Sequence, residues 1–390
     1  MLGIVLATVL FWTAAALIAY TYVGYPLLLF LVAGRRPRPE PPDLTDTALP
    51  SLSVIVAAYN EERVIEGKLA DCAAFDYPAG KLEFLFGSDG SDDSTESLIQ
   101  ATAASNVRLF RFAGRRGKLA VINDLVPHSR AEILVFTDAN TLFDPQAARR
   151  LARHFQDPCV GGVCGRLVLG RAHPPASRMV ADDATYWQFE TLIKRLEGNL
   201  GLLVAANGAN YAIRRTLFCP LPTRPAVSED MFLPAQVLIQ NLLMTFEPKA
   251  VAHETASHNT RAELRRKARN AELAYNLVPH LWPLLVPSAG RVAWMLWSHK
   301  ILRWLVPFLL LIVLGSSLAL SSILFYRVCL LLQLATAAGA LLGYWLDTRL
   351  QLPAWLSLPY YFVGGNVALL VGFFRSLSRS TNGAWARVGR

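Results

Sequence analysis

Charged side chains that could do acid–base or ligand chemistry recur in order along the central part of the chain. Asp89 and Asp138 each follow a short apolar run, Lys118 follows Gly117, and Asp230 ends the sequence Ser-Glu-Asp. A carboxylate can take a proton from a hydroxyl group or bind a cation, and a lysine beside a flexible glycine can bind an anionic group. The order of these residues predicts a site for a polar, charged substrate.

The apolar runs before Asp89 and Asp138 have the length of β-strands, and segments with helical spacing lie between them. Strands that alternate with helices in this way indicate an α/β fold with a mainly parallel sheet. Ligands of such sheets bind at the carboxyl ends of the strands, where both aspartates fall. The expected strands are 51–58, 82–87, 107–112 and 133–137, with another around Val251, and the expected helices are 61–74, 92–103, 179–196 and 233–243.

The N-terminal end of the chain is hydrophobic. Residues 2–32 carry almost no charge, which is too long a run for the core of a signal peptide, and Arg35 and Arg36 follow. We expect one transmembrane helix here whose C-terminal end faces the cytoplasm. The next residues, rich in proline and aspartate, are expected to form an irregular linker at 35–50.

The C-terminal end is also hydrophobic, but less uniformly. Residues 277–302 mix tryptophan, proline and charged residues with apolar ones, which indicates interfacial helices. Residues 304–346 are long enough for two spans joined near Tyr326, and residues 354–374 for a third.

The topology of these segments has two possible solutions. One span before the central part and three after it would place the C-terminus outside, whereas four arginines after Phe374, with no acidic residue, favour the cytoplasm. Either one C-terminal segment is re-entrant, or the region 282–302 contributes a further span.

Composition argues against two other classes of protein. The formal net charge is +9, but the Lys and Arg residues lie beside apolar segments and form no dense block, so anionic lipids are better partners than nucleic acid. The five cysteines are odd in number and contain no Cys-x-x-Cys pair, which speaks against a zinc site or a disulfide framework.

The central motifs resemble those of the family-2 glycosyltransferases with a GT-A fold, a Rossmann-like α/β fold, over about residues 51–269. The flanking segments resemble the membrane-embedded branch that includes cellulose, hyaluronan and poly-N-acetylglucosamine synthases. The domains expected from this resemblance are a transmembrane helix at 1–34, a linker at 35–50, a GT-A domain at 51–276, interfacial helices at 277–302, transmembrane helices at 303–376 and a basic tail at 377–390. The motifs that carry it are Ala57-Ala58-Tyr59-Asn60-Glu61-Glu62, Ser88-Asp89-Gly90-Ser91-Asp92-Asp93, Gly117-Lys118, Asp138-Ala139-Asn140 and Ser228-Glu229-Asp230.

The resemblance implies a role for each motif. Asp230 is expected to be the general base, with Glu229 and Trp187 near the acceptor. Asp138 and Asn140 occupy the D-x-D position and are expected to bind Mg²⁺ or Mn²⁺ together with the diphosphate, although Asn140 lacks the second charge. The residues expected to bind the nucleotide-sugar are Ala57, Tyr59, Glu61, Asp89, Lys118, Asp138, Asn207, Gly208, Arg266 and Arg269.

One feature of the sequence leaves the acceptor open. Residues 266–270 sit where processive synthases carry Q/R-x-x-R-W, but Asn270 replaces the tryptophan. The expected function is therefore inverting transfer of a sugar, from a donor that is UDP-linked by the resemblance, onto a lipid-linked or polysaccharide acceptor at the cytoplasmic face of the inner membrane, where a partner subunit could assist. The alternatives are a processive exopolysaccharide synthase, a membrane protein that only binds nucleotide-sugars, and a hydrolase that uses paired carboxylates.

Overall fold

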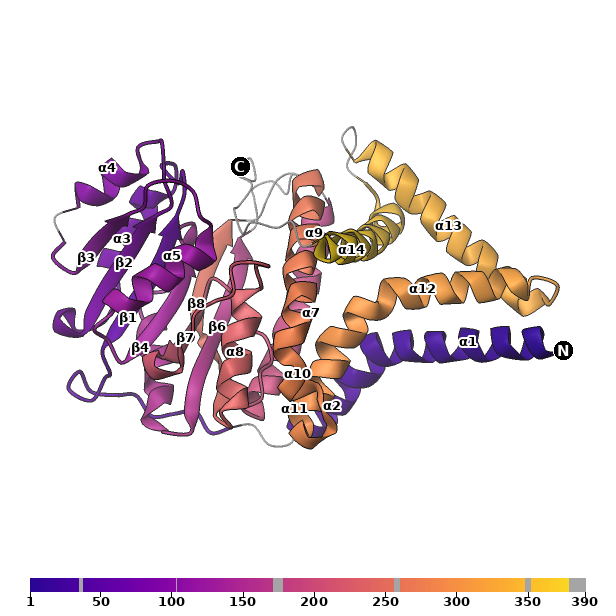
Figure 1. Ribbon diagram of the computed structural model, residues 1–390, viewed down its shortest axis with the longest axis horizontal. Helices are drawn as coiled ribbons and strands as arrows, with labels where there is room; N and C mark the ends of the chain where they lie inside the picture. The colour runs from indigo at the N-terminus through magenta and orange to yellow at the C-terminus, as the bar shows by residue number, and fades with distance from the viewer. Residues whose placement is uncertain (35–37, 103, 171–177, 256–259, 348–351, 379–390) are drawn as a thin grey trace.

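The structure is a computed structural model, and it describes residues 1–390 apart from 35–37, 103, 171–177, 256–259, 348–351 and 379–390. A domain built on a β-sheet occupies one end of the molecule. The N-terminal helix and three C-terminal helices extend from its other side (Figure 1). The predicted basic tail lies almost wholly outside the described residues.

Eight strands form one sheet within the described residues, in the order β3-β2-β1-β4-β7-β6-β8-β5. The pairs β1–β2, β2–β3, β1–β4 and β6–β8 are parallel, whereas β7 is antiparallel to β4 and β6, and β5 to β8. The expected α/β fold with a mainly parallel sheet is confirmed, with antiparallel pairings added in its second half. The strands are β1 Leu52–Ala58, β2 Leu82–Ser88, β3 Val107–Arg111, β4 Ile133–Asp138, β5 Thr141–Phe143, β6 Val160–Gly170, β7 Tyr211–Arg214 and β8 Leu243–Thr255.

Both faces of the sheet are covered, because successive side chains of a strand point to opposite faces. In β1, Val54 and Val56 join a cluster with α3, α4 and α6, whereas Ile55 and Ala57 join a cluster with α5 and α8. Because both faces of β1 are buried, its sequence is a continuous apolar run. The helices of the domain are α3 Ile65–Ala73, α4 Thr95–Gln100, α5 Lys118–Leu125, α6 Ala147–Ala152, α7 Arg178–Asn199, α8 Glu229–Ile239 and α9 Thr260–Leu277, with short 3₁₀ turns at Ala79–Lys81, Val126–His128, Arg153–Gln156 and Arg215–Leu217.

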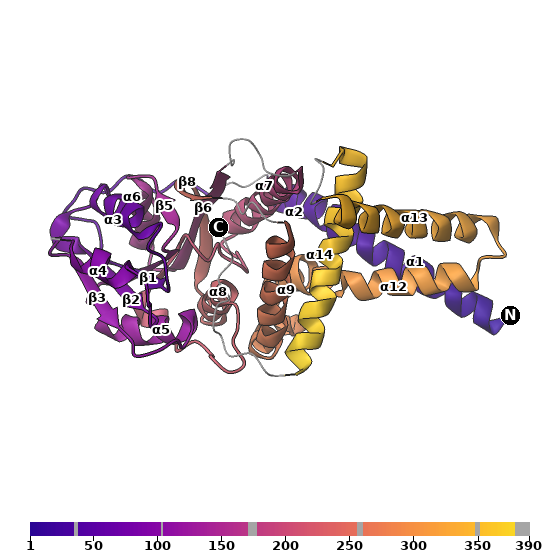
Figure 2. The same ribbon diagram turned by 90° about the horizontal axis from the view of Figure 1, so that it is seen from above.

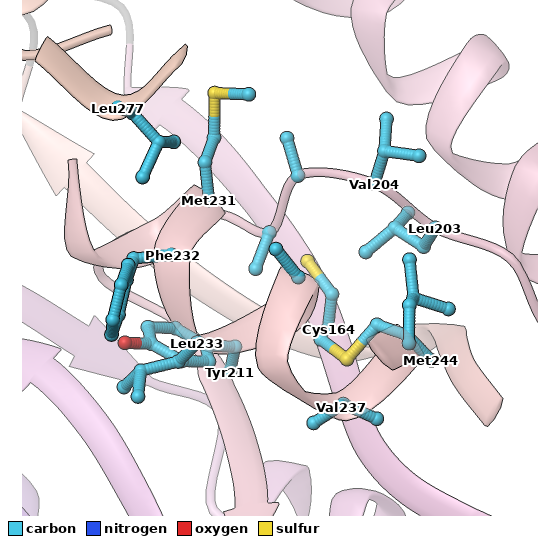
Figure 3. Packing of buried hydrophobic residues seen from close by; sticks show 14 of the residues in the cluster. Cys164, Leu203, Val204, Tyr211, Met231, Phe232, Leu233, Val237, Met244 and Leu277 are labelled. Atoms are coloured by element: carbon cyan, nitrogen blue, oxygen red, sulfur yellow. The ribbon is translucent and has the colours of Figure 1, made fainter. Parts of the chain in front are cut away.

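The larger cluster joins α8 to the sheet. Figure 3 shows Cys164 of β6 and Met244 of β8 close to Leu203, with Tyr211 of β7 beside Leu233 of α8. The helix expected at 233–243 is wrong in its bounds, because α8 begins at Glu229 and ends at Ile239. Asn241 adopts a positive φ of 59° and turns the chain, so that Leu243 begins β8. All five cysteines are free.

Four helices among the described residues are long and apolar enough to cross a membrane, at Leu2–Ala33, Arg291–Ala319, Leu324–Leu346 and Trp355–Leu377. The connection expected near Tyr326 lies earlier, at residues 320–323, and residues 291–302, expected to be interfacial, continue directly into the second of these helices. The segments are α1 Leu2–Ala19, a π-helical turn at Tyr20–Gly24, α2 Tyr25–Ala33, α11 Arg291–Leu296, a π-helical turn at Trp297–Ile301, α12 Leu302–Ala319, α13 Leu324–Leu346 and α14 Ala354–Leu377. Before α11 lie α10 Trp282–Leu285 and 3₁₀ turns at Val278–Leu281 and Pro287–Ala289.

Helix α7 connects the sheet domain to these segments through buried ionic contacts. Glu190 accepts hydrogen bonds from Lys300 at 2.7 Å and Arg303 at 2.7 Å, and it also contacts His299. Burial alone would raise the pKa of Glu190, but its contacts with Lys300, His299 and Arg303 hold it well below its ordinary value. Further along α7, Glu197 accepts a hydrogen bond from the hydroxyl of Tyr25 at 2.7 Å. The first and second membrane helices are therefore both fastened to α7.

The described part of the linker, from residue 38, is also fastened to the sheet domain by ion pairs. Arg153, whose side chain is 5% exposed, forms ion pairs with Glu40 at 2.5 Å, Asp43 at 3.0 Å and Glu247 at 2.7 Å. Arg38 pairs with Asp157 at 2.7 Å. These contacts hold the described part of the linker against the sheet domain.

Candidate active site

The predicted site residues at strand ends do gather at one edge of the sheet. β1 ends at Ala58, β2 at Ser88 and β4 at Asp138, and the three strands are parallel neighbours. Their carboxyl ends therefore lie side by side, as the sequence analysis expected. A small pocket opens there, and it is lined by Ala57, Ala58, Tyr59, Asp89, Arg115 and Lys118.

Asp89 holds the turn before α5. Its two carboxylate oxygens accept hydrogen bonds from the backbone amides of Arg116 and Gly117, each at 2.7 Å, and the residue is 4% exposed. Gly117 has a φ of 94°, a conformation that favours glycine. Both oxygens therefore help to place Lys118, the next residue, which begins α5.

The ammonium group of Lys118 lies between two carboxylates. It is 2.7 Å from Oδ1 of Asp138 and 2.5 Å from Oε1 of Glu229, and its side chain is 8% exposed. Burial alone would lower the pKa of Lys118, but Asp138 and Glu229 raise it above its ordinary value. Burial raises the pKa of Glu229 above its ordinary value, against the opposing effect of Lys118. Lys118 therefore supplies a fixed positive charge at this edge.

Asp230 lies beside Glu229 at the start of α8, and its surroundings hold it on both sides. The backbone amide of Ala206 donates to the carbonyl oxygen of Asp230 at 2.8 Å, and the Ser228 hydroxyl donates to its carboxylate. Ser228 is the N-cap residue of α8, but its side chain bonds this carboxylate and caps no backbone amide. A Cβ built on Gly208 would lie 3.5 Å from Oδ2 of Asp230, so this glycine leaves room in front of the carboxylate.

Asn207, expected to bind the nucleotide-sugar, has its side chain fully engaged within the protein. Its Oδ1 accepts from Nζ of Lys194 at 2.5 Å, and its Nδ2 donates to the carbonyl of Gly165 at 2.7 Å. The residue is 4% exposed. Its role here is to hold the segment that carries Gly208 beside Asp230.

Lys194 is a residue that the sequence analysis missed. Lys194 follows Glu190 by four positions on α7, which is the usual spacing of an ion pair on an exposed helix face. Only the fold shows that Lys194 is buried, at 4% exposure. Its ammonium group also donates to the carbonyl of Ala206 at 3.0 Å. Arg115 was likewise not singled out, and its guanidinium lies 4.0 Å from the ring centre of Tyr59.

Four other predicted residues lie at the margins of the site. Trp187 is half-buried and packs against the hydrophobic cluster that contains Val54 and Val56. Arg266 makes two hydrogen bonds to Glu263, each 2.9 Å. The pKa of Arg269 is lowered, chiefly by burial and next by the nearby charge of Arg266. The carboxylates of Glu229 and Asp138 act in the opposite direction, so Arg269 interacts electrostatically with the site. The backbone amide of Glu61 donates to the hydroxyl of Thr95 at 2.8 Å.

The D-x-D position offers oxygen ligands. Among the described residues, no three His, Cys, Asp or Glu side chains are grouped in a way that could hold a metal ion. Lys118 contacts Asp138 through Oδ1, so Oδ2 of Asp138 is a candidate ligand, and Asn140 donates its amide nitrogen to Glu254 at 3.1 Å, which leaves its amide oxygen as an acceptor. Two such oxygen atoms fit Mg²⁺ or Mn²⁺, provided that substrate phosphates complete the shell.

Comparison with known proteins agrees with this fold. The mannosyltransferase PcManGT from Pyrobaculum calidifontis, solved in complex with GDP-Man and Mn²⁺, superposes with a TM-score of 0.70 at 22% identity and covers 95% of this chain and 100% of its own. The fold is thus that of the GT-A glycosyltransferases. Residues 53–216 match the family model described as glycosyl transferase family 2, so this part of the chain is similar to that family.

Two curated relatives are similar over part of their length. The N-acetylglucosaminyltransferase of Rhizobium leguminosarum bv. viciae is 24% identical over 251 residues, which are 60% of this chain and 58% of the relative. The poly-beta-1,6-N-acetyl-D-glucosamine synthase of Staphylococcus aureus (strain COL) is 29% identical over 148 residues, which are 37% of this chain and 35% of the relative. The chain thus matches less than two thirds of the length of either.

Proposed function

We propose that the protein is an inverting glycosyltransferase that transfers a sugar from a nucleotide-sugar, UDP-linked in our proposal, onto a lipid-linked or polysaccharide acceptor. The observation that supports this most is the position of Lys118, whose ammonium joins Asp138 and Glu229 beside Asp230. A cation, a carboxylate at a strand end and a candidate base thus lie at one edge of the sheet. Transfer of a sugar from a diphosphate needs these three groups.

In the proposed reaction, Asp230 takes the proton from an acceptor hydroxyl group. The hydroxyl oxygen forms a bond to the anomeric carbon, and the bond between that carbon and the diphosphate oxygen breaks on the opposite side. The nucleoside diphosphate leaves with the bonding electron pair, and the configuration of the sugar is inverted. In this proposal Lys118 and Arg269 balance the charge that develops on the leaving diphosphate.

The nucleotide is proposed to bind in the pocket between Tyr59, Arg115 and Asp89. The Arg115 guanidinium, stacked on Tyr59, offers a planar cation that can pair with phosphate oxygens. Asp138 and Asn140 would hold a divalent cation, which when bound would neutralise the diphosphate. Glu229 and Trp187 remain proposed acceptor-side residues.

The proposed location is the inner membrane, with several spans and the sheet domain in the cytoplasm. The four candidate helices support this, as does the position of arginines at the domain side of the first of them. Membrane lipids are then direct neighbours of the enzyme, and a partner subunit remains compatible with single transfer or with polymer synthesis.

Release of nucleoside diphosphate by the detergent-purified protein tests the proposal. A panel of UDP- and GDP-sugars with Mn²⁺ or Mg²⁺ should give release with one donor. Asp230→Asn should lower that release at least about a hundredfold while donor binding remains, because a lost general base costs about 10²–10⁴ in rate. Asp46→Asn is a matched control, since Asp46 lies in the linker with 67% of its side chain exposed.

Two outcomes would contradict the proposal. Turnover near the wild-type rate in Asp230→Asn would remove Asp230 from the reaction. Release of free sugar that does not change when acceptor is added would indicate a hydrolase instead. The length of the product separates single transfer from processive synthesis, because a short, solvent-extractable lipid product excludes a polymer synthase.

A further inference from the structure

Helix α14 lies across the direction of the other candidate membrane helices. In Figure 1 it is seen nearly end-on, whereas α1 and α12 run along the long axis and α13 runs obliquely to it. In Figure 2, turned by 90°, α14 crosses the view from top to bottom while α1, α12 and α13 extend to the right. Length and composition make α14 suitable for a span, but its direction differs from that of the spans beside it.

The contacts of α14 explain this direction, because its second half packs against α9. A Cβ built on Gly372 would lie 2.5 Å from Cβ of Ala271 and 2.7 Å from the backbone nitrogen of Glu272, so the two backbones meet closely there. Tyr275 and Phe373 pack edge to face with ring centres 5.3 Å apart. Nearer the start of α14, Nζ of Lys267 lies 3.9 Å from the ring centre of Tyr361.

Helix α9 cannot lie in the hydrocarbon core of a membrane. Along the length that contacts α14 it carries charged side chains, and Arg269 is within the field of Asp138 and Glu229 in the active site. Charged groups are costly at the centre of a bilayer. Because α14 is packed along α9 from Tyr361 to Phe373, it must lie at the same depth as α9. The charged residues of this stretch of α9 are Glu263, Arg265, Arg266, Lys267, Arg269 and Glu272.

We propose that α14 does not span the membrane but lies in its plane, in the headgroup region on the side of the sheet domain. Its partner is the lipid surface itself. Side chains exposed on α14 include Trp355, Leu358 and Phe374, at 71%, 57% and 63%, which would enter the acyl boundary of that leaflet. Arg375, in the last turn, would meet anionic headgroups.

This placement resolves the conflict in topology. Three spans, α1–α2, α11–α12 and α13, return the chain to the side of the sheet domain before α14 begins. The C-terminus then lies on that side, as its arginines favour under the positive-inside rule. In this arrangement α14 lies between α9 and the lipid and supports α9 from the membrane side.

Reporter fusions to the full-length chain in a bacterial host test the proposal. Alkaline phosphatase is active only outside the cytoplasm, so we would attach it at three positions. These are the exposed turn at Gly80 in the sheet domain, Ser322 in the α12–α13 connection, and the C-terminus after Arg390. The expected readout is activity at Ser322 and none at Gly80 or the C-terminus, with a green fluorescent protein fusion fluorescent at the C-terminus.

A four-span topology predicts the opposite at one position only, namely an active phosphatase at the C-terminus with none at Gly80. That result would overturn the proposal, and so would an inactive fusion at Ser322. Phosphatase activity of the fusions does not depend on catalysis by this protein, so the experiment tests the topology independently of the proposed function.

A pair of glycine variants tests the α9–α14 contact in the intact protein. Gly372→Leu places a side chain where Ala271 and the α9 backbone already lie, whereas a Cβ on Gly365 would meet nothing within 4 Å. We expect Gly372→Leu to lower the midpoint of thermal unfolding and Gly365→Leu to leave it unchanged. Equal midpoints for the two variants would contradict the packing on which the proposal depends.

Discussion

The ammonium group of Lys194 lies 3.0 Å from the carbonyl oxygen of Ala206, whose own amide donates to the carbonyl of Asp230 at 2.8 Å. Ala206 thus connects a buried lysine on α7 to the candidate base on α8. Since α7 also carries Glu190 and Glu197, which hold α12 and α2, the position of Asp230 is connected to the membrane helices.

Lys194→Met should therefore lower kcat without weakening the sugar donor's binding. Methionine keeps the length of the side chain and loses both hydrogen bonds, so the segment 204–210 is held less firmly behind Asp230. We expect a fall in kcat of about tenfold, the effect of roughly one hydrogen bond to a charged group. Steady-state kinetics, with donor Kd from calorimetry, measures it.

Lys249→Met is the matched control, because Lys249 is an exposed lysine of β8 that pairs with Glu40 away from the site. An equal loss of kcat and donor affinity in Lys194→Met would show that this lysine supports the whole fold and does not specifically position Asp230.

Asp89→Asn should weaken nucleotide binding because it removes one of two acceptors for buried backbone amides. Leaving such an amide unpaired costs about 1–3 kcal/mol, so the turn that sets Lys118 loosens. We expect the Kd of nucleoside diphosphate to rise about tenfold in equilibrium binding. Asp92→Ala, on the exposed part of the same loop, should leave Kd near the wild-type value, and a larger effect there would contradict this interpretation of Asp89.

Asn140→Asp should destabilise the protein when no divalent cation is present. The Asn140 amide donates to Glu254, and an aspartate there would place two carboxylates together. Mn²⁺ with nucleoside diphosphate should restore the thermal unfolding midpoint in this variant by more than it shifts the wild type. If Mn²⁺ with nucleoside diphosphate raises the unfolding midpoint of the variant and of the wild type by the same amount, residue 140 is not a metal ligand. Adding Glu254→Gln should remove the loss of stability in the absence of metal.

Glu40→Gln should change how stability depends on pH. The pKa of Glu40 is lowered from 4.5 to about 2 by its hydrogen bonds to Lys249 and Arg153. A carboxyl group whose pKa is lowered on folding contributes stability above its unfolded pKa, and this is lost as pH falls toward the folded pKa. The unfolding midpoints of variant and wild type should thus differ near pH 6 and converge as pH falls from 4.5 toward 2. Glu66→Gln, an exposed carboxylate on α3, serves as the control, and a difference that does not shrink as pH falls toward 2 would contradict the assignment.

Much of the fold could be predicted from local pattern. The bounds of β1, β2, β3 and β4 agree with their apolar runs to within one or two residues, and Asp89 and Asp138 fall at the strand ends. Apolar length also located the four candidate membrane segments. Such features depend on residues near one another in the sequence, so a single chain suffices to predict them. The helix expected at 233–243 failed because Asn241 turns the chain, which no periodicity signals.

The sequence by itself determined which chemical groups are present, in which order, and that they follow strands. Only the tertiary structure decided what each group contacts. It placed Lys118 between Asp138 and Glu229, directed both oxygens of Asp89 to backbone amides, and buried Lys194 behind Asp230. It also laid α14 across the other helices. The reason is physical: these contacts join residues far apart in the chain, and their energies arise only when packing brings the partners together and removes water from between them.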